Sequence, residues 1–338
     1  MNTDRFRLDS HKLHYHPKRV AQLLDGDTSA APIYVEVSPI GACQHRCSFC
    51  AVDYLDYKST RLDRITHAVT VSKMAALGVK SIMYAGEGEP LLHTGINYMI
   101  NDAFDAGLRI AMTTNGVLLH KLNDLDRLDW IKISLNAGTR ETYAKVHGTK
   151  ADDFDRVLDN LNDAVKRRAT CVIGAQMVLL PENQHEVETL KKIGKDLGLD
   201  YVVIKPFSQH KQSLNTQYEN FKPAIPKGDD VLFVRKVAMS TQVVAYDKCY
   251  SVPDLWAYIQ SNGDVYSCSA YLGDPRFLLG NINEQSFDAI WHGDARARNA
   301  ELMRTLDVRE CRINCRMSAC NVYLDELINE KIPHKDFI

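Results

Sequence analysis

Three cysteines lie within eight residues of one another, in the run CQHRCSFC at positions 43–50. Thiolates are the soft ligands that hold zinc or iron–sulfur clusters in proteins. A closed site needs a fourth protein ligand, and His45 is the one neighbour that suits the role, although a solvent-facing His45 fits the sequence equally well. Three thiolates on a cubane cluster leave one iron open to a small chelating ligand, whereas the alternative is a zinc knuckle. Cys43, Cys47 and Cys50 are called the first cysteine group below.

The first cysteine group directly follows a short apolar run, and further apolar runs alternate along the chain with segments of helical spacing such as 68–78 and 154–165. Such alternation predicts a parallel sheet covered by helices, and six units favour an open, partial barrel over a closed barrel of eight. The six predicted strands are Tyr34–Ser38, Ser81–Ala85, Arg109–Thr114, Ile131–Leu135, Cys171–Leu180 and Tyr201–Pro206.

Polar and glycine residues stand at the ends of several of these predicted strands. A GEGEP run at 86–90 follows the second strand, Thr114-Asn115 ends the third, and Ser134 and Asn136 end the fourth. Because the carboxyl ends of parallel strands meet at one edge of a barrel, these residues are expected beside the first cysteine group. Acid or base groups near strand ends are His93, Asn136, Lys205 and His210, and no spacing singles one out.

The pattern of the first cysteine group, with an aromatic residue before its last cysteine, resembles the signature of the radical S-adenosylmethionine (SAM) superfamily. The GEGEP run resembles the family's Gly-Gly-Glu-Pro motif, with Glu87 in place of the first of the adjacent glycines. The resemblance implies a [4Fe–4S] cluster on Cys43, Cys47 and Cys50. It also implies that SAM binds the open iron and is cleaved reductively to a 5′-deoxyadenosyl radical. By the same resemblance, the residues expected to contact SAM are Phe49, Gly86, Gly88, Glu89, Thr114, Asn115, Ser134, Asn136 and Gln176.

Five further cysteines follow in the last third of the chain and are called the second cysteine group: Cys249, Cys268, Cys311, Cys315 and Cys320. A turn at 261–264 predicts a hairpin between the first two of them. This order resembles the opening of the SPASM and twitch domains of radical SAM enzymes. The resemblance implies one auxiliary [4Fe–4S] cluster, held by Cys249, Cys268 and two more thiols.

Three cysteines remain for those two further ligand positions. We favour Cys311 and Cys315, with Cys320 as the alternate ligand, and a zinc site built from these thiols is the other reading. A cysteine left over could instead donate a hydrogen atom to a substrate radical, and Cys320 is the residue predicted for that role. Cys171 lies in an apolar strand and is interpreted as a small buried side chain.

The predicted fold is therefore α/β, a partial (β/α)6 TIM-like barrel with a small C-terminal α+β domain of the twitch or SPASM type. Residues 1–30 are interpreted as a polar N-terminal extension, residues 31–225 as the barrel, and residues 226–338 as the auxiliary iron–sulfur domain. A polar, proline-containing stretch near 207–230 is the expected linker.

Net charge and hydropathy indicate which binding partners and which cellular location to expect. The formal net charge is -2, which gives no basic footprint for nucleic acid. The first residues contain no apolar signal-peptide core, and no apolar run reaches membrane-spanning length, so a cytoplasmic location is expected. In the cytosol, cysteines serve more often as metal ligands or catalytic groups than as disulfides.

These observations predict an enzyme that abstracts hydrogen from a small polar, carbohydrate-type substrate: a sugar, aminocyclitol, nucleoside or nucleotide-sugar. Dehydrogenation, epimerisation, or a related rearrangement or coupling would follow, with electrons from a flavodoxin- or ferredoxin-type donor. The first alternative is a SPASM-type peptide maturase, although the first 30 residues look too short for a leader-gripping domain. The second is a non-catalytic iron–sulfur electron carrier or sensor.

Overall fold

The computed structural model describes residues 5–8, 10–208, 212–218, 220–223, 232–234, 245–312, 315–334 and 336–337. Its strands are β1 (Tyr34–Val37), β2 (Ser81–Tyr84), β3 (Arg109–Thr114), β4 (Trp130–Ser134), β5 (Val172–Leu179), β6 (Tyr201–Pro206), β7 (Leu232–Val234), β8 (Trp256–Ile259), β9 (Asp264–Tyr266) and β10 (Leu278–Asn281). Its α-helices are α1 (Pro17–Leu24), α2 (Arg64–Leu77), α3 (Ile96–Asp105), α4 (Arg140–His147), α5 (Asp152–Arg167), α6 (Val187–Asp196), α7 (Phe287–Trp291), α8 (Asp294–Thr305) and α9 (Ser318–Ile328).

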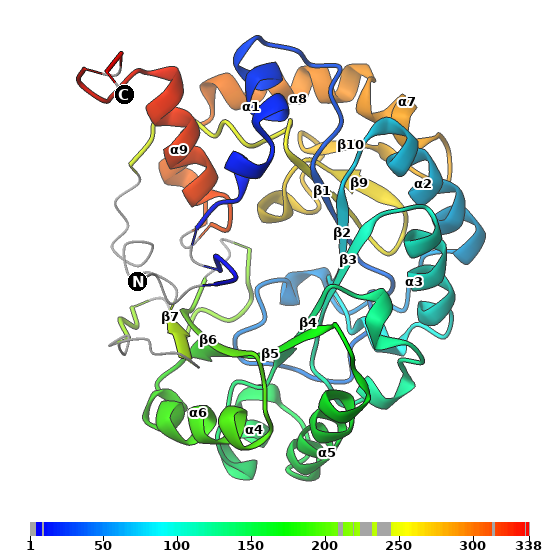
Figure 1. The fold of residues 1–338 in the computed structure, drawn as a ribbon, viewed down its shortest axis with the longest axis vertical. Helices are drawn as coiled ribbons and strands as arrows, with labels where there is room; N and C mark the ends of the chain where they lie inside the picture. The colour runs from blue at the N-terminus through cyan, green and yellow to red at the C-terminus, as the bar shows by residue number, and fades with distance from the viewer. Residues whose placement is uncertain are drawn as a thin grey trace.

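One curved sheet organises the described chain, with helices on its outside (Figure 1). Strands β1 to β6 run parallel in chain order, which confirms the six predicted strands to within one residue at each end. Their inner and outer residues are mostly buried, as expected when helices cover one face and the barrel interior lies on the other. The α/β partial-barrel fold is confirmed.

The sheet continues beyond the six predicted strands on both sides. Strand β7 joins β6 in parallel, and β8 joins β1 in parallel through Tyr34↔Trp256 and Val37↔Ile259. Strands β9 and β10 then add to β8 in antiparallel fashion, so the hairpin predicted at 261–264 is present. The predicted boundary between residues 225 and 226 therefore separates two sequence regions but not two sheets.

Local sequence signals set the ends of α2 and α4. The carboxylate of Asp63 caps α2 by accepting from the backbone N–H of Thr66, and Gly78 ends the helix in a left-handed conformation. Thr139 caps α4 in the same way, and Gly148 ends it with φ +56°. The second of these endings places His147 at the carboxyl edge of the sheet.

The N-terminal segment is part of the folded body. Leu13 and Val20, around α1, pack against Leu255 and against Leu324 of α9. Chain ends far apart in sequence thus lie side by side, as the adjacent α1 and α9 of Figure 1 show. None of the described helices is both long and apolar enough to cross a membrane.

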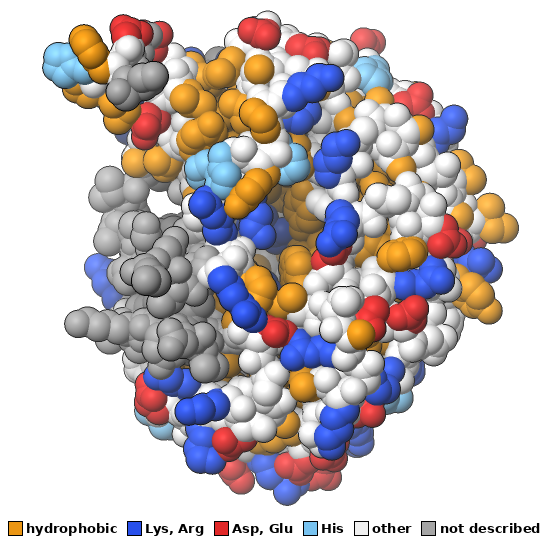
Figure 2. Space-filling view, in the orientation of Figure 1, with side chains coloured by type: hydrophobic (Ala, Val, Ile, Leu, Met, Phe, Trp, Pro, Cys, Tyr) orange, Lys and Arg blue, Asp and Glu red, His pale blue; other side chains and the backbone are white. Residues whose placement is uncertain are grey.

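Charge is distributed unevenly over one face of the molecule. Lysine and arginine side chains gather near the middle of the face drawn in Figure 2, whereas acidic and basic side chains alternate around its rim.

Candidate active site

A cavity of about 550 Å³ opens at the carboxyl ends of the barrel strands. All three members of the first cysteine group line it, together with the GEGEP loop and the ends of β3, β4 and β5. Residues of the C-terminal region, including Ser269, Leu272 and Arg312, line it as well. The cavity is therefore shared between the barrel and the C-terminal region.

The loop that carries the first cysteine group is held by backbone hydrogen bonds. The N–H of Arg46 donates to the carbonyl of His147 at 3.0 Å, and the N–H of Ser48 donates to that of Val146 at 2.9 Å. Both bonds anchor the loop on the last turn of α4. All three thiols are free, and burial raises the pKa of Cys43 to about 12. Metal binding must displace such a thiol proton, which couples site loading to pH.

His45 has a different environment from the solvent-facing one that the sequence left open. It is only 1% exposed, and its Nε2 lies 3.6 Å from a carboxylate oxygen of Asp153. Both ring nitrogens are without a hydrogen-bond partner.

The glycines of the GEGEP loop are required by close backbone approach. A Cβ on Gly88 would lie 2.2 Å from the carbonyl oxygen of Ala42, and one on Gly86 would lie 2.4 Å from Cβ of Ser38. Gly86 also has φ +127°, a conformation that side-chain-bearing residues rarely adopt. The loop is thus pressed against the segment just before Cys43.

Glu89 lines the cavity and braces the loops around it. Its carboxylate accepts from Oγ1 of Thr114 at 2.5 Å, from the N–H of Asn115 at 2.8 Å and from the N–H of Leu91 at 3.1 Å. Burial raises the pKa of Glu89, while these hydrogen bonds lower it. The carboxylate therefore joins the second and third strand ends.

Eight of the nine residues expected to contact SAM line this cavity: Phe49, Gly86, Gly88, Glu89, Thr114, Asn115, Ser134 and Gln176. Two of them hold buried polar atoms without a partner, namely Nδ2 of Asn115 and Oε1 of Gln176. Unpaired buried polar atoms at a cavity wall are suited to a polar ligand.

Asn136 is the ninth predicted contact, and the structure places it elsewhere. Among the described residues it does not line the cavity, and its side chain is fully buried. Its Oδ1 accepts from the N–H of Val178 at 2.8 Å, and its backbone has φ +56°. The side chain is turned into the protein because it ties β4 to β5, which a strand-end position alone does not reveal.

Three members of the second cysteine group, Cys249, Cys268 and Cys320, lie close to Cys315. Burial, and then the charge on Cys315, raises the pKa of Cys249 and of Cys320 to about 12. The same two causes raise the pKa of Cys268. The Sγ atom of Cys311 lies 3.3 Å from the hydroxyl of Tyr271.

Cys320 was predicted as a hydrogen-atom donor or an alternate ligand. It lies in α9, packs with Tyr250 and Leu324 beside α1, and is absent from the described residues that line the cavity. This placement argues against the donor role, because a thiol must reach the substrate radical to reduce it. Its proximity to Cys315 keeps the ligand role open.

Several cavity residues were missed by sequence reasoning. Arg316 pairs with the buried carboxylate of Glu36 on β1, and Nε of Arg312 is buried without a hydrogen-bond partner. Glu87 accepts from the N–H of Ser261 at 3.0 Å and from its hydroxyl at 3.3 Å. Of these contacts, only the one made by Glu87 had a signal in the sequence, because Glu87 replaces a glycine of the family motif.

Of the strand-end acid and base groups, Lys205 lines the cavity, and His93 is buried with Nε2 2.9 Å from the carbonyl of Leu62. His210 lies outside the described residues.

Family comparisons agree with this geometry. The model of the Radical SAM superfamily matches residues 37–193, which include the first cysteine group and the GEGEP loop. This part of the chain is a radical SAM domain. The model of the SPASM iron–sulfur cluster-binding domain matches residues 249–320, which span the second cysteine group, so the protein is a radical SAM protein with a SPASM-type C-terminal domain.

Among curated proteins, the chain is similar to GTP 3′,8-cyclase of Chlorobaculum tepidum, with 28% identity over 53% of this chain and 55% of that protein. It is also similar to a probable GTP 3′,8-cyclase of Metallosphaera sedula, with 35% identity over 47% of this chain and 50% of that protein. The matches thus cover about half the length of these relatives.

Solved structures resemble most of the fold at low sequence identity. Streptococcus suis SuiB bound to the precursor peptide SuiA has a TM-score of 0.62 at 15% identity and covers 86% of this chain and 71% of its own. Native anSMEcpe with bound AdoMet has a TM-score of 0.55 at 15% identity and covers 81% of this chain and 83% of its own. These likenesses support the partial-barrel fold.

Family membership implies a [4Fe–4S] cluster that binds SAM and auxiliary iron–sulfur binding. The residues present fit both groups. Three thiols outside any disulfide line the cavity beside unpaired polar atoms of Asn115 and Gln176, and the thiols of Cys249, Cys268 and Cys320 lie near Cys315. Thiolates are the ligands that such clusters require.

Proposed function

We propose that this protein cleaves SAM reductively and abstracts a hydrogen atom from a small polar substrate bound in the cavity between the two cysteine groups. The substrate class is a sugar, aminocyclitol, nucleoside or nucleotide-sugar, and the net reaction is a dehydrogenation, an epimerisation or a related rearrangement or coupling. When bound at Cys43, Cys47 and Cys50, the cluster and SAM supply a 5′-deoxyadenosyl radical. One auxiliary [4Fe–4S] cluster on Cys249, Cys268, Cys311 and Cys315 completes the proposal.

The observation that carries this proposal is the lining of the cavity. The first cysteine group lines it from the barrel, and Arg312 lines it from the SPASM-type region. A volume of about 550 Å³ lies within the range of small-molecule sites. A substrate held here would therefore lie within reach of both regions.

Several lining side chains suit a polar, ring-containing substrate. Tyr34, Trp130 and Tyr258 offer apolar ring faces, and Arg312 has a buried Nε without a partner. Guanidinium groups bind carboxylates and phosphates in planar geometry. The curated relatives are named for a reaction of GTP, which supports the nucleoside and nucleotide members of the class.

The chain's own residues position the reactants. Glu89 fixes the ends of β2 and β3, and the GEGEP glycines allow the loop to lie against the segment before Cys43. Fixed positioning is the main contribution that a protein makes to cofactor chemistry. The electron comes from an external flavodoxin- or ferredoxin-type donor, and we place the enzyme in the cytoplasm, where thiols stay reduced.

The test is to reconstitute the protein anaerobically, add SAM and dithionite, and quantify 5′-deoxyadenosine. Separate reactions receive a pool of sugars, aminocyclitols, nucleosides and nucleotide-sugars, or a pool of peptides. The matched variant is Arg312→Met, which keeps a flexible, unbranched side chain but removes the guanidinium group and its charge. We expect the small-molecule pool to raise 5′-deoxyadenosine above the uncoupled level, and Arg312→Met to raise KM with little change in that uncoupled level.

Other outcomes assign other functions. A response to peptides alone would make the protein a peptide maturase. No 5′-deoxyadenosine from iron-loaded protein would reject the radical SAM activity and favour an electron carrier or sensor.

A further inference from the structure

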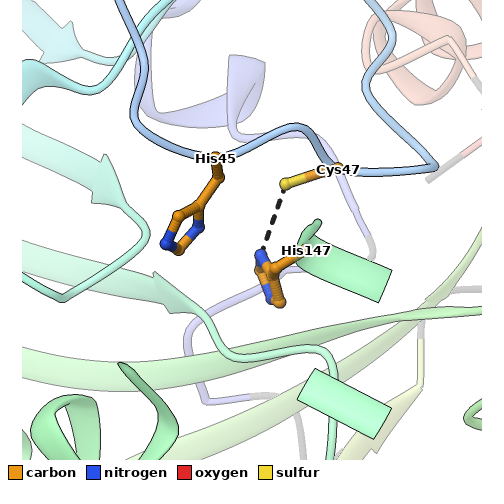
Figure 3. Close-up of side chains that lie close together, drawn as sticks. All are labelled: His45, Cys47 and His147. Carbon is orange, nitrogen blue, oxygen red and sulfur yellow. Dashed lines mark hydrogen bonds between the residues drawn. The ribbon is translucent and has the colours of Figure 1, made fainter. Parts of the chain in front are cut away.

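A histidine side chain contacts one thiol of the first cysteine group. The Sγ atom of Cys47 is 3.3 Å from Nδ1 of His147, and Figure 3 shows the imidazole ring turned toward that sulfur. His147 is 1% exposed and comes from the last position of α4, one hundred residues further along the chain. No motif of the first cysteine group includes it.

The backbone around His147 is built to bring the ring to the sulfur. Its carbonyl accepts from the N–H of Arg46, the residue just before Cys47. Gly148 follows with φ +56°, and a Cβ there would lie 2.4 Å from the carbonyl oxygen of Arg46. A side chain at position 148 would push the two segments apart, so the glycine permits the contact.

The far side of the ring is equally constrained. Nε2 of His147 lies 3.1 Å from the carbonyl oxygen of Leu135 and 3.4 Å from Nδ2 of Asn136. Because Oδ1 of Asn136 accepts from the N–H of Val178, the amide nitrogen of Asn136 must face the histidine. Nε2 therefore has both an acceptor and a donor within reach.

Aromatic side chains fix the plane of the ring. Tyr143 stacks on His147 with ring centroids 4.3 Å apart, and Phe49 meets it edge-on at 5.6 Å. The hydroxyl of Tyr143 is buried without a hydrogen-bond partner, so its ring contributes packing alone. A ring stacked by Tyr143, met edge-on by Phe49 and held at Nε2 has little freedom to turn away from Cys47.

We propose that His147 is a positioning residue for the SAM-binding cluster: it directs Cys47 and donates a hydrogen bond from Nδ1 to the Cys47 sulfur once that sulfur is a cluster ligand. This inference rests on the proposed function.

Because Nε2 lies near both the carbonyl of Leu135 and the amide of Asn136, His147 can form a hydrogen bond with Cys47 whether the sulfur is a thiol or a thiolate. While Cys47 is a thiol, Nε2–H donates to Leu135, and Nδ1 accepts from the thiol. When Cys47 is a thiolate ligand, Nδ1–H donates to it, and Nε2 accepts from the amide of Asn136. A donor at a ligand sulfur stabilises the more negative, reduced cluster and raises its reduction potential.

The experiment measures the potential of the cluster rather than turnover. Full-length protein is reconstituted, its iron and sulfide are quantified, and a redox titration follows the electron paramagnetic resonance signal that changes when SAM is added. The variants are His147→Phe, which keeps a stacked ring without a donor, and His147→Asn, which returns a donor near the position of Nδ1. Tyr143→Phe is the matched control.

We expect His147→Phe to make reduction of the SAM-responsive cluster roughly tenfold less favourable, equivalent to about 59 mV for one electron. His147→Asn should recover part of this shift, and Tyr143→Phe should leave the potential unchanged. If His147→Phe fails to load iron at this site, recovery of loading by His147→Asn but not by His147→Gln also supports the role.

Two results would overturn the inference. One is His147→Phe with the wild-type potential and iron content, and the other is an equal shift in Tyr143→Phe, which would indicate packing alone. A wild-type protein with iron but without any SAM-responsive signal would overturn the proposed function and this inference with it.

Discussion

The two cysteine groups are held in different ways. The first occupies positions 43–50 on a single loop, which backbone hydrogen bonds and glycine contacts fasten to the barrel. The second is drawn from positions 249–320 and is supported by side chains, such as Nδ2 of Asn321 at 3.4 Å from Sγ of Cys249. The first site is thus local in sequence, whereas the second depends on tertiary packing of the C-terminal region.

The difference affects what each region tolerates. A local loop brings its ligands together with little loss of chain entropy, whereas distant ligands meet only after the intervening chain has folded. We therefore expect substitutions in the packing of the C-terminal region to affect the second cysteine group strongly and the first only slightly.

The largest expected effect comes from Cys47→Ala. It should reduce 5′-deoxyadenosine formation to background and remove about four iron atoms per chain, while the second cysteine group stays loaded. Iron analysis and the SAM-responsive paramagnetic signal check this. Cys171→Ala is the control, because Cys171 is buried in the barrel away from the cavity. Loss of all iron from Cys47→Ala would show that the two sites do not load independently.

Next in size is the contrast between Cys268→Ala and Cys320→Ala. The first should remove about four iron atoms per chain and keep the SAM-responsive signal. The second should keep full iron content, because Cys320, within α9, packs in the apolar cluster beside α1. Iron loss from Cys320→Ala with full loading of Cys311→Ala would make Cys320 a ligand in place of Cys311.

Asn321→Ala tests the side-chain support of the second group. Oδ1 of Asn321 accepts from the N–H groups of Tyr250 and Ser251 and from the hydroxyl of Ser251, so its loss leaves buried donors unpaired. We expect the free energy of unfolding to fall by about 2 kcal/mol. Glu326→Ala, at an exposed position of α9, is the control for a truncated polar side chain in the same helix. Thermal unfolding together with iron content distinguishes destabilisation from ligand loss.

The smallest effect is expected at the link between the two regions. Glu87→Gly restores the family residue and removes both hydrogen bonds to Ser261, which should lower the free energy of unfolding by about 1 kcal/mol. Glu87→Gln keeps an acceptor and should lose less. An equal loss in both variants would mean that the charge, not the hydrogen bond, links the regions.

The Glu87 carboxyl also has a signed dependence on pH. Burial raises its pKa above the ordinary value of 4.5, although the hydrogen bonds from Ser261 oppose this shift. A raised pKa stabilises the fold at pH below 4.5, and that contribution is lost as the pH rises through the folded-state pKa. Chemical unfolding across this range should therefore show a flatter pH dependence for Glu87→Gln than for the wild type.

The spacing of apolar residues and the residue types at turns predicted most of the barrel. The six strands follow from apolar runs, and the hairpin follows from a turn at Asn262-Gly263. The parallel pairing of β8 with β1 was missed, because lateral neighbours leave no mark in the period of either strand. A short strand buried on both faces also looks the same beside a barrel as inside a separate domain.

The candidate site was predictable where chemistry follows spacing. Three close cysteines and a glycine-rich turn identify the cavity wall, but they say nothing of the residues behind it. Asn136 and His147 illustrate this, since both depend on which segments meet at the end of α4. Arg312 is likewise brought to the cavity only by tertiary packing.

The pairing of β8 with β1 also determines how late in synthesis the free edge of β1 can be covered. Strand β1 emerges early, yet one of its two neighbours comes from positions 256–259. Until that segment is translated, the nascent barrel has an unpaired apolar edge, the kind of surface that recruits chaperones or aggregates. Ribosome-bound chains that stop before β8 should therefore be markedly more sensitive to protease than chains that continue past β10.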